Sequence, residues 1–278
     1  MPRRRLGFAL ATVLGLAPRG FFIPYRYAGT LPPPGARPPY GAMEKFLRRH
    51  ERDFQAALSR VDEYADSLRA IGDAAPPEPR WDQSWFPRLD AAVAYALVRE
   101  TGPRRIVEIG SGHSTRFLAR AVADGGHATR ITAIDPAPRA PILGLALDII
   151  RAPVHRVGDA LLAELTAGDV LFIDSSHILM PGSDVDWVLN HALPTLPTGA
   201  RVHFHDVFLP DDYPSEWAWR GYNEQLGVAA LVQGGAYRPL FASHYVSTRM
   251  DDALRAGVIP ELPLVPGARE SSLWLEKM

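Results

Sequence analysis

The sequence predicts a doubly wound, Rossmann-like α/β domain, that is, a mostly parallel sheet with helices on both faces, preceded by an N-terminal helical extension. Two observations indicate this fold class. Beyond residue 80, short and nearly continuous apolar runs alternate with helical stretches, and parallel strands that are buried on both faces carry such runs. The chain has 278 residues, 47% hydrophobic and 22% charged, which is enough to bury a full core.

The first 17 residues resemble a signal peptide, with three arginines followed by an apolar run from Leu6 to Ala17. That run is too short to span a membrane. Pro18 directly follows the best small-residue cleavage position, which argues against export. We therefore expect a cytoplasmic protein whose N-terminal segment packs on the domain, with export and membrane-surface attachment as the alternatives. The Pro-rich residues 31–39 predict an extended linker.

Between Glu44 and Ile71, apolar residues recur at spacings of three, four and seven among charged residues, which predicts one amphipathic helix. Gly72 and the prolines of residues 76–79 end this helix and indicate a boundary near residue 80. The predicted organisation is an N-terminal segment over residues 1–80 and a ligand-binding domain over residues 81–278.

The domain beyond this boundary has five segments with the apolar character of buried strands, separated by helical patterns. The predicted strands are Arg105–Ile109, Arg130–Ile134, Val154–Val157, Asp169–Ile173 and Ala200–His205. The predicted helices are Leu89–Glu100, Ser114–Asp124, Pro141–Ile149, Ala160–Leu165 and Asp184–Leu193. Two later segments, Leu240–Tyr245 and Ser272–Leu275, are predicted as edge strands.

The composition restricts the chemistry that the chain can perform. Thirty basic and 31 acidic side chains give a formal net charge of −1, so no overall positive field favours nucleic acid or an anionic membrane as a partner, and only a local basic patch stays open. Cysteine is absent, which excludes disulfides and thiolate catalysis. Only two lysines, Lys45 and Lys277, are present. Catalysis or metal binding must therefore rely on histidine and carboxylates.

The most informative stretch is Ile106–Ser114, in which an apolar strand runs into a glycine-rich turn and then a helix. Gly110 and Gly112 allow a tight turn and a close approach by a ligand, and the helix that follows presents free N–H groups. A nucleotide-like ligand is expected at this turn. Thr115 stands where a dinucleotide fingerprint has its third glycine, which disfavours a pyrophosphate ligand.

Asp135 ends the second predicted strand, 25 residues after Gly110. At this position a carboxylate can accept hydrogen bonds from both hydroxyls of a ribose. The alternative interpretation is an ordinary turn or cap residue, because aspartate is common in both. We favour ribose binding.

Four polar residues follow the fourth and fifth predicted strands: Asp174, His177, His205 and Asp206. Carboxyl ends of parallel strands line the crevice where ligands bind, so these side chains are expected to meet at one rim if the two strands are neighbours. Strand alternation places His203 on the same face as His205. Because His203 lies in mid-strand, we interpret it as structural.

This convergence has two functional interpretations and one structural one. Asp174, His205 and Asp206 form an oxygen and nitrogen donor set suited to a divalent cation, which would lower the pKa of a substrate hydroxyl. Alternatively, His177 or His205 acts as a general base without a metal. The third interpretation is that these groups only bond to one another in a polar crevice.

Two aromatic segments flank the predicted rim. One spans residues 208–224 after the fifth strand, and the other spans residues 83–88 before the sheet. Aromatic side chains in Pro-interrupted loops are costly to leave in water, so they either pack on the domain or cover a bound acceptor. Both interpretations stay open for each segment.

The pattern Glu108-x-Gly110-x-Gly112 after a strand resembles motif I of class I S-adenosylmethionine-dependent methyltransferases. With Trp85–Arg88, Ile173–His177 and His203–Asp206, the sequence resembles the methyltransferase-24 family over residues 81–275. The resemblance implies S-adenosylmethionine as cofactor and transfer to a small-molecule acceptor. The implied cofactor-binding residues are Glu108, Gly110, Ser111, Gly112, Ser114, Asp135 and, near the adenine, Asp159.

Metal-dependent methyltransferases of this fold, of the catechol and cephamycin-pathway types, carry acidic or amide ligands at the same strand ends. His205 replaces an expected carboxylate here, which disfavours Mg²⁺ and leaves Mg²⁺ or Mn²⁺ as one option. The predicted function is therefore O-methylation of a small-molecule or sugar hydroxyl, with Asp174, His177 and His205 as catalytic residues. The alternatives are a nicotinamide-dependent oxidoreductase, disfavoured by Thr115 and the lack of a Tyr-x-x-x-Lys pair, and a cofactor-binding module without turnover.

Overall fold

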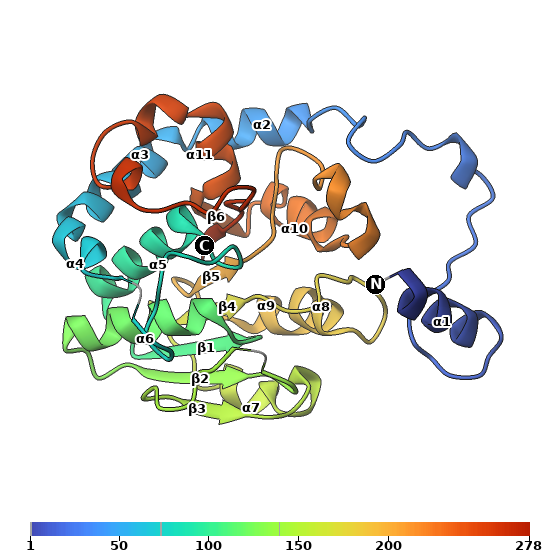
Figure 1. The fold of residues 1–278 in the computed structure, drawn as a ribbon, viewed down its shortest axis with the longest axis horizontal. Coiled ribbons are helices and arrows are strands. Elements are labelled where there is room, and N and C mark those ends of the chain that lie inside the picture. Colours follow the sequence, from blue (N-terminus) through green and yellow to red (C-terminus); the bar gives the residue numbers. More distant parts are fainter. Residues whose placement is uncertain (1, 73, 139) are drawn as a thin grey trace. The chain divides into compact units, whose positions relative to one another are not determined.

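Two compact units make up the chain, Met1–Arg37 and Pro38–Met278. The computed structural model describes residues 2–72, 74–138 and 140–278 (Figure 1). The first unit contains helix α1, Pro2–Val13, and a 3₁₀ turn, Ala28–Thr30. Within the described ranges, no helix combines the length and the apolar character needed to cross a membrane.

The second unit is built on one seven-stranded sheet with the order β3-β2-β1-β4-β5-β7-β6. Strands β1 to β5 pair in parallel, and β7 runs antiparallel to both β5 and β6. The chain reverses direction across the sheet between β1 and β4, which is the switch point of a doubly wound fold. The strands are β1 Arg105–Ile109, β2 Arg130–Ile134, β3 Asp148–Ile150, β4 Val170–Ile173, β5 Arg201–Phe204, β6 Tyr237–Ala242 and β7 Leu273–Lys277.

Helices cover this sheet, and the fold class predicted from the sequence is confirmed. Phe86, Phe172 and His203 contact one another on one face, whereas Leu171 and Val202 alternate to the other face and are fully buried. The helices of the second unit are α2 Gly41–Arg48, α3 Glu51–Glu63, α4 Ala65–Arg69, α5 Arg88–Thr101, α6 His113–Gly125, α7 Gly158–Leu162, α8 Asp184–Trp187, α9 Leu193–Thr195, α10 Glu224–Gln233 and α11 Ser243–Arg249. A π-helical turn, Val188–Ala192, joins α8 to α9.

The single helix predicted from Glu44 to Ile71 is wrong in detail, because the structure divides it into α2, α3 and α4. No glycine or proline marks the breaks. His50 contacts the rings of Phe46 and Phe54, and Tyr64 packs on Tyr95 at 6.2 Å. Tertiary packing therefore overrides the helical pattern and keeps the apolar stripe directed at the core.

The elements predicted between β2 and β4 are also wrong. The expected helix Pro141–Ile149 is a series of turns, with Gly144 at φ +97°, followed by the short strand β3. The expected strand Val154–Val157 is a 3₁₀ turn that leads into α7. Pro153 directly precedes this turn and cannot donate a ladder hydrogen bond, which favours a turn over a strand there.

Both late strands exist, although only β6 lies at the edge, since β7 lies between β5 and β6. Pro239 in β6 coincides with a shift of register between Pro239 and Phe241. A proline is tolerated at a bulge in an edge strand, where one ladder hydrogen bond is already missing.

Candidate active site

The glycine turn joins β1 to α6 and lies directly against the end of β4. Gly110 has a φ of +84°, and a Cβ there would lie 1.8 Å from the carbonyl oxygen of Asp174. A Cβ on Gly112, in contrast, would meet no atom within 4 Å. Gly110 is therefore required by the packing of the protein itself, whereas Gly112 leaves open space above the turn.

Glu108 stabilises this turn through buried hydrogen bonds. Its side chain is fully buried and accepts hydrogen bonds from the hydroxyls of Ser114 (2.7 Å) and Thr115 (2.6 Å). The Thr115 hydroxyl in turn accepts a hydrogen bond from the N–H of Gly112 at 2.8 Å. Burial raises the pKa of Glu108 to about 8, although both hydroxyl bonds act in the opposite direction. Thr115 thus links the turn to the buried acid, and this explains why threonine occupies the third glycine position.

Asp135 ends β2 beside the turn. Its carboxylate accepts hydrogen bonds from the N–H (3.0 Å) and the hydroxyl (2.8 Å) of Ser111, and from the N–H of Ala137 (2.8 Å). Asp135 is partly exposed. The structure therefore brings Asp135 and the glycine turn together.

Asp159 is not joined to this group by any hydrogen bond or ion pair among the described residues. It lies in the first turn of α7, its side chain is 72% exposed, and it pairs with His191 at 3.1 Å. The predicted position of Asp159 depended on a third strand that ends at Val157. The third strand actually ends at Ile150, whose carbonyl accepts a hydrogen bond from the N–H of Asp135.

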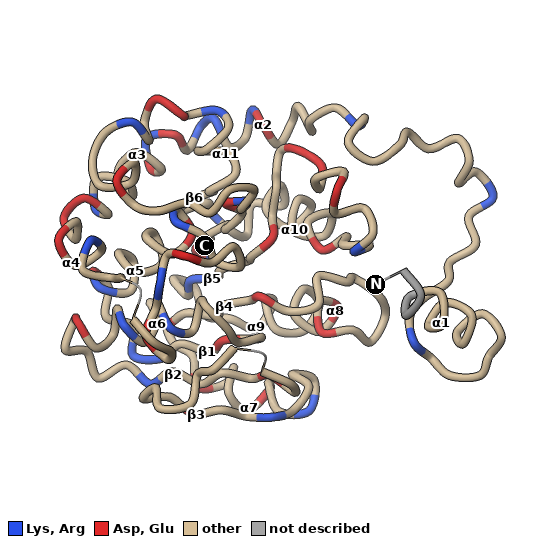
Figure 2. Tube along the Cα trace, viewed as in Figure 1, with Lys and Arg blue, Asp and Glu red and all other residues tan. Residues whose placement is uncertain are grey.

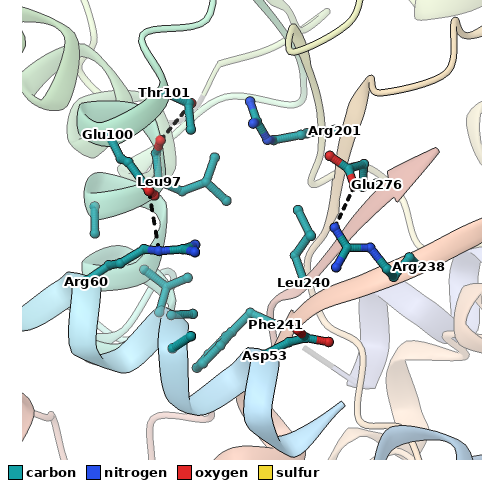
Figure 3. A pocket seen from close by; sticks show the side chains of 14 residues that line it. Asp53, Arg60, Leu97, Glu100, Thr101, Arg201, Arg238, Leu240, Phe241 and Glu276 are labelled. Carbon is teal, nitrogen blue, oxygen red and sulfur yellow. Dashed lines mark hydrogen bonds and ion pairs between the residues drawn. The ribbon is translucent and has the colours of Figure 1, made fainter. Parts of the chain in front are cut away.

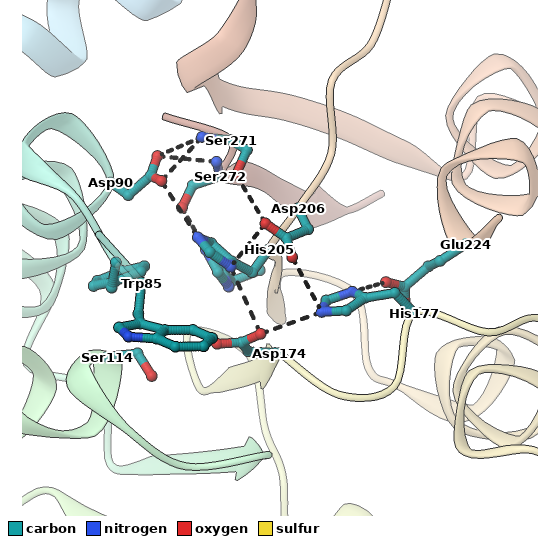
Figure 4. A network of polar contacts seen from close by, with 12 residues as sticks. Trp85, Asp90, Ser114, Asp174, His177, His205, Asp206, Glu224, Ser271 and Ser272 are labelled. Atoms are coloured by element: carbon teal, nitrogen blue, oxygen red, sulfur yellow. Dashed lines mark hydrogen bonds and ion pairs between the residues drawn. The ribbon is translucent and has the colours of Figure 1, made fainter. Parts of the chain in front are cut away.

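The four polar residues after β4 and β5 converge, because these two strands are neighbours (Figure 4). His177 Nε2 lies 3.4 Å from Asp174 Oδ1 and 3.5 Å from Asp206 Oδ2. His205 Nδ1 lies 3.6 Å from Asp174 Oδ1 and 3.5 Å from Asp206 Oδ1. One network, called the rim network below, therefore consists of Asp174, His177, His205 and Asp206.

Two buried carboxylates outside the predicted set hold the imidazoles from behind. Glu224, at the start of α10, accepts a hydrogen bond from His177 Nδ1 at 2.8 Å. Asp90, in the first turn of α5, lies 3.4 Å from His205 Nε2 and accepts the backbone N–H groups of Ser271 and Ser272. Both acids are fully buried. The sequence feature that could have pointed to Asp90 is an acidic residue within an otherwise apolar helix.

The charges of the network are strongly coupled. Burial alone would lower the pKa of His177 and of His205, but the neighbouring carboxylates hold both pKa values well above the usual range. Although burial acts in the opposite direction, His205 and His177 hold the pKa of Asp174 far below its usual range. With Asp90 and Glu224 included, four carboxyl groups surround the two imidazoles.

Backbone strain accompanies this arrangement. His177 (φ 59°) and Asp206 (φ 55°) are the only non-glycine residues with a positive φ among those the structure describes. Left-handed backbone costs such residues about 1 kcal/mol or more. The surrounding hydrogen bonds must therefore hold both residues in place.

The predicted metal ligands do not form a metal site in this arrangement. Across residues 2–72, 74–138 and 140–278, no group of histidines and acids has the geometry to hold a metal ion. His205 Nδ1 lies 3.6 Å from Asp174 Oδ1 and 3.5 Å from Asp206 Oδ1. Asp174, His205 and Asp206 therefore pair with one another.

His203 lies beneath the network in the core, as predicted. It is fully buried, stacks on Phe172 at 3.7 Å, and its Nε2 bonds to the hydroxyl of Ser272 at 2.8 Å. Burial lowers the pKa of His203 well below its usual value, with a smaller contribution in the same direction from His205.

Aromatic residues from both predicted segments surround the rim network. Trp85 is 60% exposed, and its ring lies beside Asp174 (Figure 4). Arg220 stacks on Trp217 with its guanidinium carbon 3.8 Å from the ring centroid, and its Nη1 lies 3.8 Å from Asp206. The aromatic segment after β5 is thereby tied to the network through one arginine.

A separate cavity of about 270 Å³ lies between α3, α5 and the opposite ends of β5, β6 and β7 (Figure 3). Its charged groups are paired with each other: Arg60 with Glu100 at 3.3 Å, and Arg238 with Glu276 at 2.7 Å. None of the predicted site residues lines this cavity. The chemistry suggested by the sequence therefore lies at the glycine turn and the rim network.

The doubly wound sheet and the glycine turn are consistent with the class I methyltransferase fold predicted from the sequence. Residues 107–207 match the model of the Methyltransf_24 family, described as "Methyltransferase domain". This segment contains the glycine turn, Asp135 and the rim network. Residues 107–207 therefore match a methyltransferase domain, and the predicted resemblance to class I S-adenosylmethionine-dependent methyltransferases is confirmed over this segment.

Two solved structures resemble this chain at low sequence identity and low TM-score. An SAH-bound methyltransferase from Podospora anserina aligns at 16% identity and a TM-score of 0.43, covering 93% of this chain and 99% of that one. An O-methyltransferase from Bacillus cereus in complex with SAH aligns at 15% identity and a TM-score of 0.38, covering 66% and 82%. Neither similarity is high enough to bear on the substrate. No curated protein matches the sequence.

Proposed function

We propose that this methyltransferase transfers the methyl group of S-adenosylmethionine to a hydroxyl of a small molecule or sugar. One observation carries the proposal. Asp174 is 32% exposed and anionic, its backbone lies against Gly110 of the glycine turn, and two imidazoles contact its carboxylate. An acceptor hydroxyl bonded to Asp174 would therefore lie next to the cofactor turn and beside groups that can exchange a proton.

The open space above Gly112 and the partly exposed Asp135 support cofactor binding at the turn. In this proposal Ser111 and the N-terminus of α6 contact the cofactor, and Asp135 accepts the ribose hydroxyls. Glu108 and Ser114 position the turn from below, since both are buried. When bound, the cofactor supplies an electrophilic methyl group on a cationic sulfonium, and the Asp174 carboxylate beside the turn favours that charge. Asp159 lies in the first turn of α7, and this proposal assigns it no contact with the cofactor.

Asp174 orients the acceptor hydroxyl, and the network removes its proton. Asp174 Oδ1 is within 3.6 Å of both His177 Nε2 and His205 Nδ1, so a proton that reaches this oxygen can pass to whichever imidazole is neutral. Because both imidazoles have raised pKa values, one must first lose its proton. Turnover should therefore rise with pH through an apparent pKa above 6.5. The donors do not fit a metal, so no metal takes part in this scheme.

Calorimetry with the purified chain tests cofactor binding, with S-adenosylmethionine and its demethylated product as ligands and NAD as the comparison. We expect binding of the first two and none of NAD. Transfer of a labelled methyl group to a panel of phenols, sugars and amines then tests turnover. Asp174→Asn should reduce turnover at least about a hundredfold while cofactor affinity changes less than about threefold.

Asp251→Asn is the matched control, because Asp251 is an exposed carboxylate that pairs with Arg255 at 2.9 Å. It should leave both quantities unchanged. Tight binding of NAD would support the oxidoreductase instead. Cofactor binding without transfer to any acceptor would support a binding module, and preferential methylation of amines would refute the hydroxyl assignment.

A further inference from the structure

The first unit, Met1–Arg37, has a charge composition opposite to that of the rest of the chain. It contains six arginines and no acidic residue. The coloured part of this unit in Figure 2 carries blue positions and no red one. The formal net charge of −1 is therefore the sum of +6 in this unit and −7 in residues 38–278, which hold 24 basic and all 31 acidic side chains. The six arginines are Arg3, Arg4, Arg5, Arg19, Arg26 and Arg37.

The same unit exposes large apolar side chains at high density. Leu14 is 66% exposed, Leu16 76%, Phe21 61%, Phe22 69% and Ile23 63%. Single exposed apolar residues are common in proteins, but a contiguous group of them marks an interaction surface. Since the whole stretch also lacks acidic residues, its partner should combine an apolar phase with negative charge.

The backbone of this unit is ordered locally, so these side chains are presented from a defined scaffold. Helix α1 ends at Val13 and is followed by a turn at Gly15, with φ +69°, after which the N–H of Leu16 donates to the carbonyl of Ala11 at 2.9 Å. The N–H of Arg19 then donates to the Thr12 hydroxyl at 3.0 Å, which turns the chain back toward the helix. Residues 20–23 follow directly, so the two apolar segments belong to one compact unit.

We propose that the unit Met1–Arg37 binds the surface of an anionic lipid bilayer and attaches the methyltransferase to it. The 12 residues of α1 extend about 18 Å, which is shorter than the roughly 30 Å hydrocarbon core, so the helix lies in the interface. Leucine and phenylalanine side chains enter the acyl boundary while arginines contact lipid phosphates. Tyr25 and Tyr27, both 55% exposed, have the amphipathic rings typical of that boundary.

The connection to the second unit suits this role. Residues 31–39 contain five prolines and form no helix or strand, so they act as an extended spacer between the two units. The proposal concerns this unit alone and does not depend on the reaction assigned to the second unit. A failure of lipid binding would therefore leave the proposed methyl transfer untouched.

Vesicle flotation with the full-length purified chain tests the proposal. Vesicles of phosphatidylcholine alone are compared with vesicles containing about one third phosphatidylglycerol, at low and high salt. We expect binding to the anionic vesicles that weakens as salt rises. The triple variant R3Q/R4Q/R5Q should lower the partition coefficient by roughly a hundredfold, since each arginine near an anionic surface contributes about a factor of five.

A second variant, F21S/F22S/I23S, should lower binding by at least roughly a hundredfold through loss of apolar contact. The matched control is R49Q/R52Q/R255Q, which removes the same charge from three exposed positions of the second unit and should bind like the native chain. Equal losses in the control and in R3Q/R4Q/R5Q would overturn the proposal. So would binding that does not depend on phosphatidylglycerol, or concentration-dependent self-association by light scattering without vesicle binding.

Discussion

Replacement of Gly110 by alanine gives the most direct test of the packing between the glycine turn and β4. The new Cβ would lie 1.8 Å from the carbonyl oxygen of Asp174, whereas real Cβ contacts stay beyond about 3.0 Å. The two segments would have to separate by about 1.2 Å, the difference of these distances. The φ of +84° adds about 1–2 kcal/mol for a residue with a Cβ. With overpacking, we expect Gly110→Ala to lower the free energy of unfolding by about 2–5 kcal/mol.

Two other glycines separate the cost of the backbone conformation from the cost of the steric contact. Gly235 has a φ of +79° and open space around it, so Gly235→Ala should lose only the backbone contribution, about 1–2 kcal/mol. Gly112→Ala should leave the unfolding free energy within about 1 kcal/mol of the native value. Its methyl group would nevertheless occupy the space assigned to the cofactor, which should weaken cofactor binding about tenfold or more.

Denaturant titration and calorimetry with S-adenosylmethionine measure both quantities for the three variants. If Gly110→Ala is no less stable than Gly235→Ala, the close packing of the turn on Asp174 is refuted. If Gly112→Ala binds the cofactor as tightly as the native chain, the cofactor does not lie over the turn.

Three further predictions concern the titratable groups. Burial raises the pKa of Glu108 to about 8, so its contribution to stability is complete below about pH 4.5 and is lost as pH rises through 8. Between pH 5 and 9, the free energy of unfolding of Glu108→Gln should therefore rise by a few kcal/mol relative to that of the native chain, as measured by denaturant titration. Glu224→Gln should lower the pKa of His177 and move the rising limb of turnover about one pH unit lower without changing cofactor affinity; an unmoved limb would exclude His177 as the proton acceptor. Treatment with EDTA should change turnover less than twofold, because the predicted metal ligands pair with one another; a loss restored by Mn²⁺ would contradict that pairing.

The sequence predicted those features that depend on strand ends. Apolar, β-branched runs located β1, β2, β4 and β5, and the rule that parallel strands end at one edge placed Asp174 near His205. The three-residue strand β3 was missed because its pattern is too short to separate from a turn. The strand that Asp159 was expected to follow was therefore wrong, whereas its predicted contact with the adenine stays a prediction.

Asp90 and Glu224 could not be assigned to the rim network from the sequence, because their positions depend on how α5 and α10 pack against the sheet. The break at Tyr64 has the same origin, since Tyr64 packs on the ring of Tyr95, which lies on another helix. Local pattern predicts elements, whereas contacts between distant segments decide how elements bend and which side chains meet.

The left-handed backbone at His177 and Asp206 has a consequence for protein engineering. Glycine or asparagine would relax both positions, so a library selected only for thermal stability should accumulate these residues there. The same substitutions would remove an imidazole or a carboxylate from the rim network. Selection for stability and selection for activity should therefore diverge at these two positions, and sequencing both pools after parallel selection would reveal the conflict.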